Sequence, residues 1–214
     1  MSYRRKFLPP PRTREYRKLF VIAVEGDQTE PHYFHFLRND LDSAVVEVEV
    51  IPPNGKSAPQ HVLKKLLEYR IQPGLAEKLE RWMVIDRDQW PAGNLDQVVK
   101  SCRKNKIGLC VSNPAFEFWL LLHFERGDGI EPAEKDSGNR SADECGKRLR
   151  AKRYLPGFNT KLSKKHWTVL RKNLKNAIDH AKALDSPSCT DYPRQRIGST
   201  VYRLVESLEA MLGK

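Results

Sequence analysis

The feature of this chain that most limits its fold is a continuous apolar run that ends in an acidic turn. Residues 19–24, Leu-Phe-Val-Ile-Ala-Val, have no polar member, and Glu25-Gly26-Asp27 follows directly. A strand with one face in water would alternate apolar and polar residues, so this run predicts a strand that is buried on both faces. Such strands are typical of parallel sheets that helices cover on both sides.

Further strand and helix patterns alternate along the first half of the chain. Strands are predicted over 45–51, 80–85 and 107–111, and helices over 29–38, 59–71 and 95–105. Thr29 is expected to cap the first of these helices, with Pro31 in its first turn. Because short turns separate the elements, the sequence predicts an α/β fold with a mostly parallel central sheet and helices on both faces.

The second half is predicted to be mainly helical. Ser112 or Asn113 is expected to cap a deeply buried helix that begins at Pro114. Residues 125–145 are polar and contain glycine, so a loop is expected there. Two C-terminal helices, over 163–184 and 199–212, are predicted to complete a single domain that spans residues 18–214. Residues 1–17 are basic, include three consecutive prolines, and are expected to form a flexible arm.

The formal net charge of +11 is concentrated in one segment. Residues 147–175 contain eleven Lys or Arg and no Asp or Glu. A phosphate backbone is the natural ligand of such a segment, because neutralising phosphates supplies most of the non-specific affinity for nucleic acid. A solvated basic surface without a ligand is the alternative. The candidate nucleic-acid contacts are Lys147, Arg148, Arg150, Lys152, Arg153, Lys161, Lys164, Lys165, Arg171 and Lys172.

No segment has the length and apolarity of a membrane span, and the first residues do not resemble a secretory signal. A cytoplasmic location without membrane contact is therefore expected. The four cysteines lack the paired spacing of zinc sites and are interpreted as reduced thiols.

Acidic residues follow two of the predicted strands. Glu25 ends the first, and Asp86 and Asp88 end the strand over 80–85. Ligands of open α/β sheets bind at the carboxyl ends of strands, where these carboxylates would gather and repel one another unless a cation neutralised them. Oxygen-only ligands select Mg²⁺ or Mn²⁺. The alternative is that the acids are helix caps or ion-pair partners of Arg87 and nearby lysines.

This arrangement resembles the TOPRIM module, and four segments resemble more closely the RloB family, TOPRIM-like proteins of bacterial and archaeal mobile defence islands. The segments are 24–34 (Val-Glu-Gly-Asp-Gln-Thr-Glu-Pro-His-Tyr-Phe), 85–88 (Ile-Asp-Arg-Asp), 112–124 (Ser-Asn-Pro-Ala-Phe-Glu-Phe-Trp-Leu-Leu-Leu-His-Phe) and 199–205 (Ser-Thr-Val-Tyr-Arg-Leu-Val). The resemblance covers residues 18–210. At Asp27 and Gln28 the chain departs from the family, because many members have Lys or Arg there, and no phosphate-binding role is assigned to these two residues.

The resemblance implies a metal-dependent nuclease that acts in defence against phage or foreign nucleic acid, often beside a partner ATPase of the ABC/SMC-like type. Asp86 and Asp88 would hold the metal, and Glu25 would be a further ligand or the general base for the attacking water. Glu117 is either an additional metal ligand or a carboxylate that is bonded to a backbone amide or to an arginine.

Other assignments stay open at this point. A non-catalytic nucleic-acid-binding subunit of a defence complex is the alternative function, and neither the choice between DNA and RNA nor homo-oligomerisation is decided. Three histidines near the expected site could act as bases or metal ligands, although ordinary structural positions are favoured: His32, His35 and His123. Three aromatic residues in the basic segment could stack on bases or pack in the core: Tyr154, Phe158 and Trp167.

Overall fold

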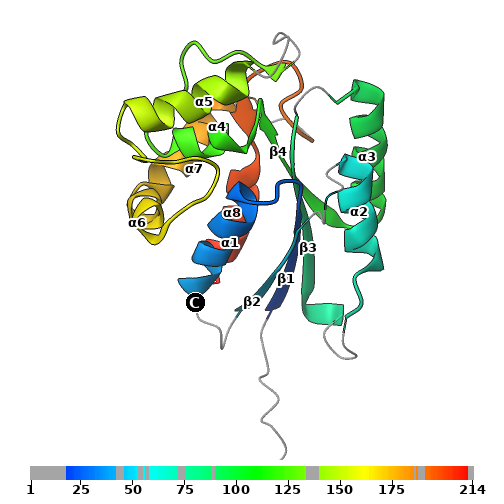
Figure 1. Ribbon diagram of the computed structural model, residues 1–214. Coiled ribbons are helices and arrows are strands. Elements are labelled where there is room, and N and C mark those ends of the chain that lie inside the picture. Colours follow the sequence, from blue (N-terminus) through cyan, green and yellow to red (C-terminus); the bar gives the residue numbers. More distant parts are fainter. Residues whose placement is uncertain are drawn as a thin grey trace, which may run out of the picture.

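The computed structural model describes most of the chain (Figure 1). The described residues are 18–41, 46–52, 55, 58–71, 76–87, 90–133, 140–185, 187 and 191–211. The predicted arm over residues 1–17 lies outside this set, and so does Asp88.

A five-stranded sheet in the order β2-β1-β3-β4-β5 forms the centre of the molecule. Four strands are parallel: β1 (Lys18–Val24), β2 (Val46–Ile51), β3 (Leu79–Asp86) and β4 (Ile107–Asn113). The short β5 (Gly198–Ser199) runs antiparallel to β4. The predicted mostly parallel α/β sheet is confirmed, and the architecture is compatible with a TOPRIM-like fold.

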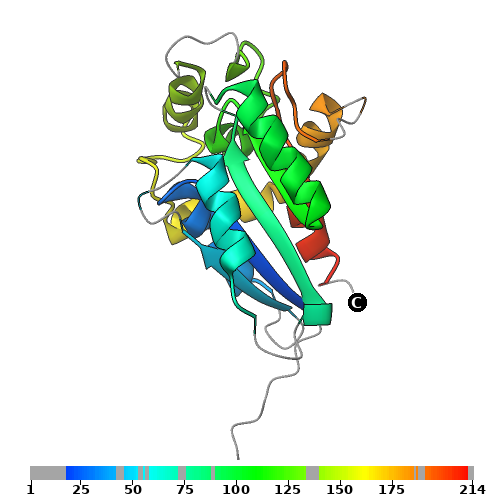
Figure 2. The same ribbon diagram turned by 90° about the vertical axis from the view of Figure 1, so that its right-hand side faces the viewer.

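Helices cover both faces of this sheet. One face carries α2 (Pro59–Glu68) and α3 (Ala92–Lys104), which lie side by side in Figure 2. The other face carries α1 (Thr29–Asn39), α4 (Phe116–Leu122) and α8 (Val201–Glu209), with α7 (Leu174–Leu184) packed against α4 and α8. No helix in the described part of the chain is long and apolar enough to cross a bilayer.

The two faces of β1 enter two separate cores. Phe20, Ile22 and Val24 belong to the larger core under α1, α4 and α8. The intervening Leu19, Val21 and Ala23 pack toward α2 and α3. Because side chains alternate along a strand, burial on both faces explains why the run contains no polar residue.

The helical region departs from the sequence-based prediction at two places. The helix α5 (Arg140–Ala151) begins inside the segment expected to be a loop, so that prediction was wrong for residues 140–145. The helix predicted over 163–184 is divided into α6 (Lys164–Lys172) and α7. Asn173 stands between them, and its side-chain amide donates to the carbonyl of Val169 at 2.9 Å.

Both predicted helix caps were also wrong. Gln28 occupies the N-cap position of α1, and Thr29 is the first helical residue. Asn113 belongs to β4, is joined to Pro114 by a cis peptide bond, and uses its side chain to bind the backbone of Pro193 and Ala133. Ala115 occupies the N-cap position of α4. At the C-terminal end, β5 takes the start of the predicted helix over 199–212, and α8 begins at Val201.

Candidate functional site

Glu25 and Asp86 lie together at the carboxyl ends of two hydrogen-bonded strands. The backbone N–H of Glu25 continues the ladder by donating to Val84 at 3.1 Å. The side chain of Glu25 accepts the backbone N–H of Asp86 at Oε2 (2.9 Å) and the indole N–H of Trp90 at Oε1 (3.1 Å). These donors fix the carboxylate beside Asp86.

The residue after Asp86 anchors this edge to the next strand. The backbone N–H of Arg87 donates to the carbonyl of Ser112 at 2.8 Å, next to the pairing of Asp86 with Ser112 in the sheet. The buried guanidinium of Arg87 donates to the carbonyl of Trp90 at 2.6 Å. Asp88, the third predicted metal ligand, is outside the described residues. Among those that are described, no group of three or more His, Cys, Asp or Glu side chains has the geometry to hold a metal ion.

A third carboxylate, which was not predicted from the sequence, folds back under the same acidic turn. Glu30 is buried, with 4% of its surface exposed, and its Oε1 accepts the backbone N–H of Gly26 at 3.0 Å. Burial, together with the nearby carboxylate of Glu117, raises the pKa of Glu30 to about 7. A Cβ atom at Gly26 would lie 2.1 Å from Oε2 of Glu30, so only glycine allows this approach. The Gly-x-x-x-Glu spacing was the available signal.

Glu117 faces the start of α1 from the first turn of α4. Its Oε1 lies 3.2 Å from the hydroxyl oxygen of Thr29, and burial raises its pKa. The same hydroxyl lies 2.9 Å from the carbonyl oxygen of Thr160. A threonine hydroxyl carries one hydrogen, so these two oxygens share the Thr29 donor, and the carbonyl oxygen of Thr160 is the nearer acceptor. Glu117 thus bonds to the hydroxyl of Thr29, a partner that neither of its two sequence-based interpretations named.

The three histidines occupy different environments. His123 is fully buried; its Nδ1 donates to the carbonyl of Trp119 at 3.1 Å, and burial lowers its pKa to about 4. It is therefore a neutral core residue at physiological pH. His32 is partly buried and His35 is exposed on α1.

The predicted basic contacts divide into two groups. Three of them bind carboxylates of the chain itself: Arg148 contacts Glu125 and Glu144, Lys152 contacts Glu125, and Arg171 contacts Asp40 and Glu209. The others lie exposed on α5, on α6 and on the loop between them: Lys147, Arg150, Arg153, Lys161, Lys164, Lys165 and Lys172. Figure 1 shows α5 toward the end of the molecule where β4 terminates.

The aromatic residues of the basic segment are mostly unavailable for stacking on bases. Phe158 and Trp167 are buried in the larger core, where the indole N–H of Trp167 donates to Asp40 at 3.0 Å. Tyr154 is partly buried and stacks on Phe124, with ring centroids 4.4 Å apart. These contacts favour the packing interpretation for Phe158 and Trp167.

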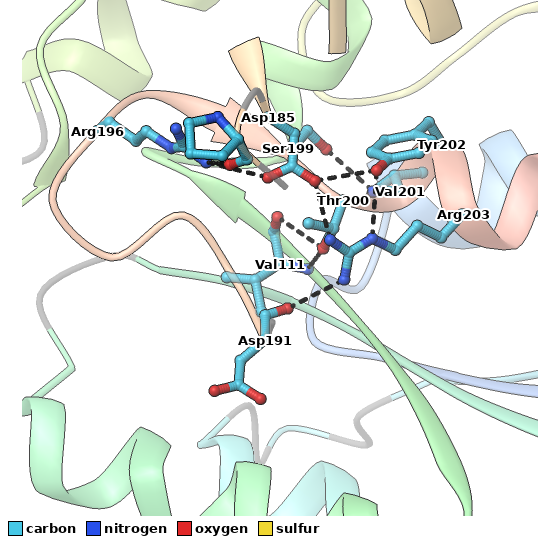
Figure 3. Close-up of polar contacts among 10 residues, drawn as sticks. Val111, Asp185, Asp191, Arg196, Ser199, Thr200, Val201, Tyr202 and Arg203 are labelled. Carbon is cyan, nitrogen blue, oxygen red and sulfur yellow. Dashed lines mark hydrogen bonds and ion pairs between the residues drawn. The ribbon is translucent and has the colours of Figure 1, made fainter. Parts of the chain in front are cut away.

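A polar network joins the start of α8 to the end of β4 (Figure 3). The buried carboxylate of Asp185 accepts from Arg203 at 2.8 Å, from the hydroxyl of Tyr202 at 2.9 Å and from Arg196 at 3.2 Å. Beside it, Thr200 exchanges hydrogen bonds with the backbone of Val111. The network therefore holds the start of α8 against the end of β4, the strand next to Asp86.

Replacing Asp185 by Ala is expected to lower the free energy of unfolding by about 3 kcal/mol, because the change removes the shared partner of two guanidinium groups. Urea denaturation measures this loss. Asp179→Ala is the matched control: Asp179 pairs with Lys175 on the exposed side of α7, where an ion pair contributes little. Equal stability of the two variants would contradict a structural role for the network.

Comparison with known proteins identifies a family and nothing more specific. The model of the family described as RloB-like protein matches residues 20–208, which is nearly the whole chain and includes Glu25, Asp86 and Glu117. No curated protein and no solved structure matches the chain. The match over 20–208 shows that the chain belongs to the RloB-like family.

Proposed function

We propose that this protein is a metal-dependent nuclease that hydrolyses phosphodiester bonds. The observation that carries the proposal is the placement of Glu25 and Asp86 at neighbouring carboxyl ends of parallel strands, with the carboxylate of Glu25 fixed on the backbone of Asp86. Asp88, two residues further along, supplies a second oxygen ligand beside Asp86. This oxygen-only donor set fits Mg²⁺ or Mn²⁺.

Each residue has a separate task in this proposal. Asp86 and Asp88 would hold the metal ion, which would supply Lewis-acid activation of the scissile phosphate and of the leaving oxygen. Glu25 accepts the proton of the attacking water, and the N–H groups of Asp86 and Trp90 orient its carboxylate for this step. Glu117 bonds to Thr29 and is not assigned to the metal.

The exposed lysines and arginines of residues 147–172 bind the phosphate backbone of the substrate. Membership of the RloB-like family supports a role in defence against foreign nucleic acid beside an ABC/SMC-like ATPase. Incubation of the protein with labelled single- and double-stranded DNA and RNA, in Mg²⁺, Mn²⁺ or a chelator, tests the activity. Cleavage that requires the metal supports the proposal, and substrate that stays intact in every metal contradicts it.

A non-catalytic nucleic-acid-binding subunit is the second candidate. The observation that favours it is that both oxygens of Glu25 already accept hydrogen bonds, as in a structural carboxylate. This candidate keeps the basic surface and predicts binding that is unaffected by divalent metal.

Reversing the charges of Lys164 and Lys165 to Glu is expected to weaken nucleic-acid binding and to reduce the slope of log K against log salt concentration by about two, because each lost phosphate contact contributes about one. Fluorescence anisotropy at several salt concentrations measures the slope. Reversal of Lys100 and Lys104 on α3 is the matched control, since it makes the same change in net charge on the opposite face of the sheet. Equal effects of the two double variants would contradict a specific basic surface.

A further inference from the structure

The loop between α5 and α6, residues 152–163, is held by several anchors. Leu155, Phe158 and Leu162 are buried in the larger core. The ring of His166 accepts the backbone N–H of Ser163 at Nδ1 (3.3 Å), and its Nε2 donates to the carbonyl of Pro156 at 2.8 Å. The loop therefore has one defined path over the core.

One residue of this loop has an unusual backbone conformation. Thr160 has φ +81°, a region that is rare for residues with a branched Cβ. Such conformations persist only where surrounding contacts enforce them, and they are common at functional sites. The contact at Thr160 is the hydroxyl of Thr29, which donates to the carbonyl oxygen at 2.9 Å.

Thr29 joins this loop to the acidic turn. It is the first residue of α1 and follows the turn of residues 25–28 that begins with Glu25. Thr29 is itself buried, with 5% of its surface exposed. The hydrogen bond from the buried hydroxyl of Thr29 to the carbonyl of Thr160 thus fixes the distance between the loop and the turn that carries Glu25.

The loop brings exposed positive charge to this junction. Lys161 follows Thr160 directly, and Lys164 and Lys165 begin α6. Within the described residues these three lysines form no ion pair, in contrast to Arg148, Lys152 and Arg171. Their charge remains available to an external anion.

We propose that Thr29 is a positioning residue for the nucleic-acid substrate. By holding the carbonyl of Thr160, it places Lys161 and the lysines at the start of α6 so that the phosphate backbone they bind passes the edge formed by Glu25 and Asp86. This inference rests on the proposed function and adds how the substrate is aligned with the carboxylates.

The test compares Thr29→Val, which keeps the shape of the side chain and removes the donor, with Thr29→Ser, which keeps the donor. In Thr29→Val, amide hydrogen exchange over residues 156–163 is expected to increase about two- to tenfold, the effect of losing one hydrogen bond. Nucleic-acid binding weakens by a similar factor, and the loss of cleavage appears in KM more than in kcat. Thr29→Ser restores both exchange and binding.

Unchanged exchange in Thr29→Val, or faster exchange with wild-type binding, would overturn the inference. So would a Thr29→Ser variant as impaired as Thr29→Val, because bulk rather than the hydroxyl would then be responsible. If Thr29→Val does not fold, Lys161→Ala on the exposed loop provides the test. For Lys161→Ala, the slope of log K for nucleic-acid binding against log salt concentration is expected to decrease by about one. Lys104→Ala on α3 serves as the control. Equal slopes in wild type and Lys161→Ala would overturn the inference.

The outcome also separates this inference from the nuclease proposal. If the wild type binds nucleic acid and does not cut it in any metal, the nuclease proposal fails, while exchange and binding in the Thr29 variants still decide the role of Thr29. If the wild type cuts and Thr29→Val cuts with an unchanged KM, the nuclease proposal stands and the positioning role fails.

Discussion

The Asp86→Asn variant is expected to lose metal-dependent cleavage by about a hundredfold or more while its apo form stays as stable as the wild type. The change keeps the size of the side chain and removes one charge from an edge that also carries Glu25, so it removes affinity for the cation and repulsion between carboxylates together. The magnitude is the loss commonly seen when one group that stabilises a transition state is removed. Single-turnover cleavage assays and thermal unfolding measure the two quantities.

Asp96→Asn is the matched control for this variant. Asp96 lies on α3 and pairs with Arg194 at the surface, so the same chemical change there leaves cleavage intact. If Asp86→Asn instead lowers the stability of the apo protein by more than ~2 kcal/mol, as the loss of a buried paired charge does, Asp86 is part of the scaffold. The binding-subunit function would then be favoured.

The second large effect concerns pH and Glu30. Its pKa of about 7 in the folded protein exceeds the ordinary value of 4.5, so folding favours the protonated form. The stability that protonated Glu30 contributes is complete below pH 4.5 and is lost as the pH rises through about 7. The Glu30→Gln variant keeps an acceptor for the N–H of Gly26 and cannot ionise. At pH 8, without metal, it is expected to be more stable than the wild type by up to about 3 kcal/mol.

Urea denaturation of both proteins from pH 4 to pH 8 checks this expectation. The stability of the wild type should fall relative to that of Glu30→Gln as the pH rises from 4.5 to 7, and the difference should be largest above pH 7. Glu68→Gln on the exposed side of α2 is the control and should follow the wild type. Parallel curves for wild type and Glu30→Gln would show that Glu30 is ionised without penalty in the folded protein.

The sheet could be predicted from the sequence because its strands are long, apolar and separated by short turns. The apolar run before Glu25 has no polar residue, and burial on both faces of β1 is the physical reason. The position of Glu25 beside Asp86 followed from the same pattern, since neighbouring parallel strands end at one edge of the sheet.

The helix α5 was not predicted because its buried stripe is weak. Its buried residues include Ser141, Cys145 and Leu149, and charged residues occupy most of its other positions. The break at Asn173 was missed for a different reason. Leu170, Leu174, Ala177 and Ala181 are all buried at helical spacing, so apolar periodicity is continuous across the break.

Long-range side-chain contacts account for the remaining errors in the site. Thr29 has the residue type of an N-cap, and its hydroxyl instead binds Thr160, which is 131 residues away in the sequence. Glu30 resembles an ordinary acidic residue in the first turn of a helix. Its burial depends on the contact with Gly26 and on the approach of Glu117 from α4, which no local pattern predicts.

Calorimetric titration of the wild-type protein with Mn²⁺ tests the central proposal most directly, because it requires neither a substrate nor a partner ATPase. We expect saturable binding that is lost in Asp86→Asn and kept in Asp96→Asn. We also expect the thermal unfolding temperature to rise with metal concentration in the proteins that bind the metal. Absence of binding to the wild type, or equal binding by wild type and Asp86→Asn, would contradict a metal centre at Glu25 and Asp86.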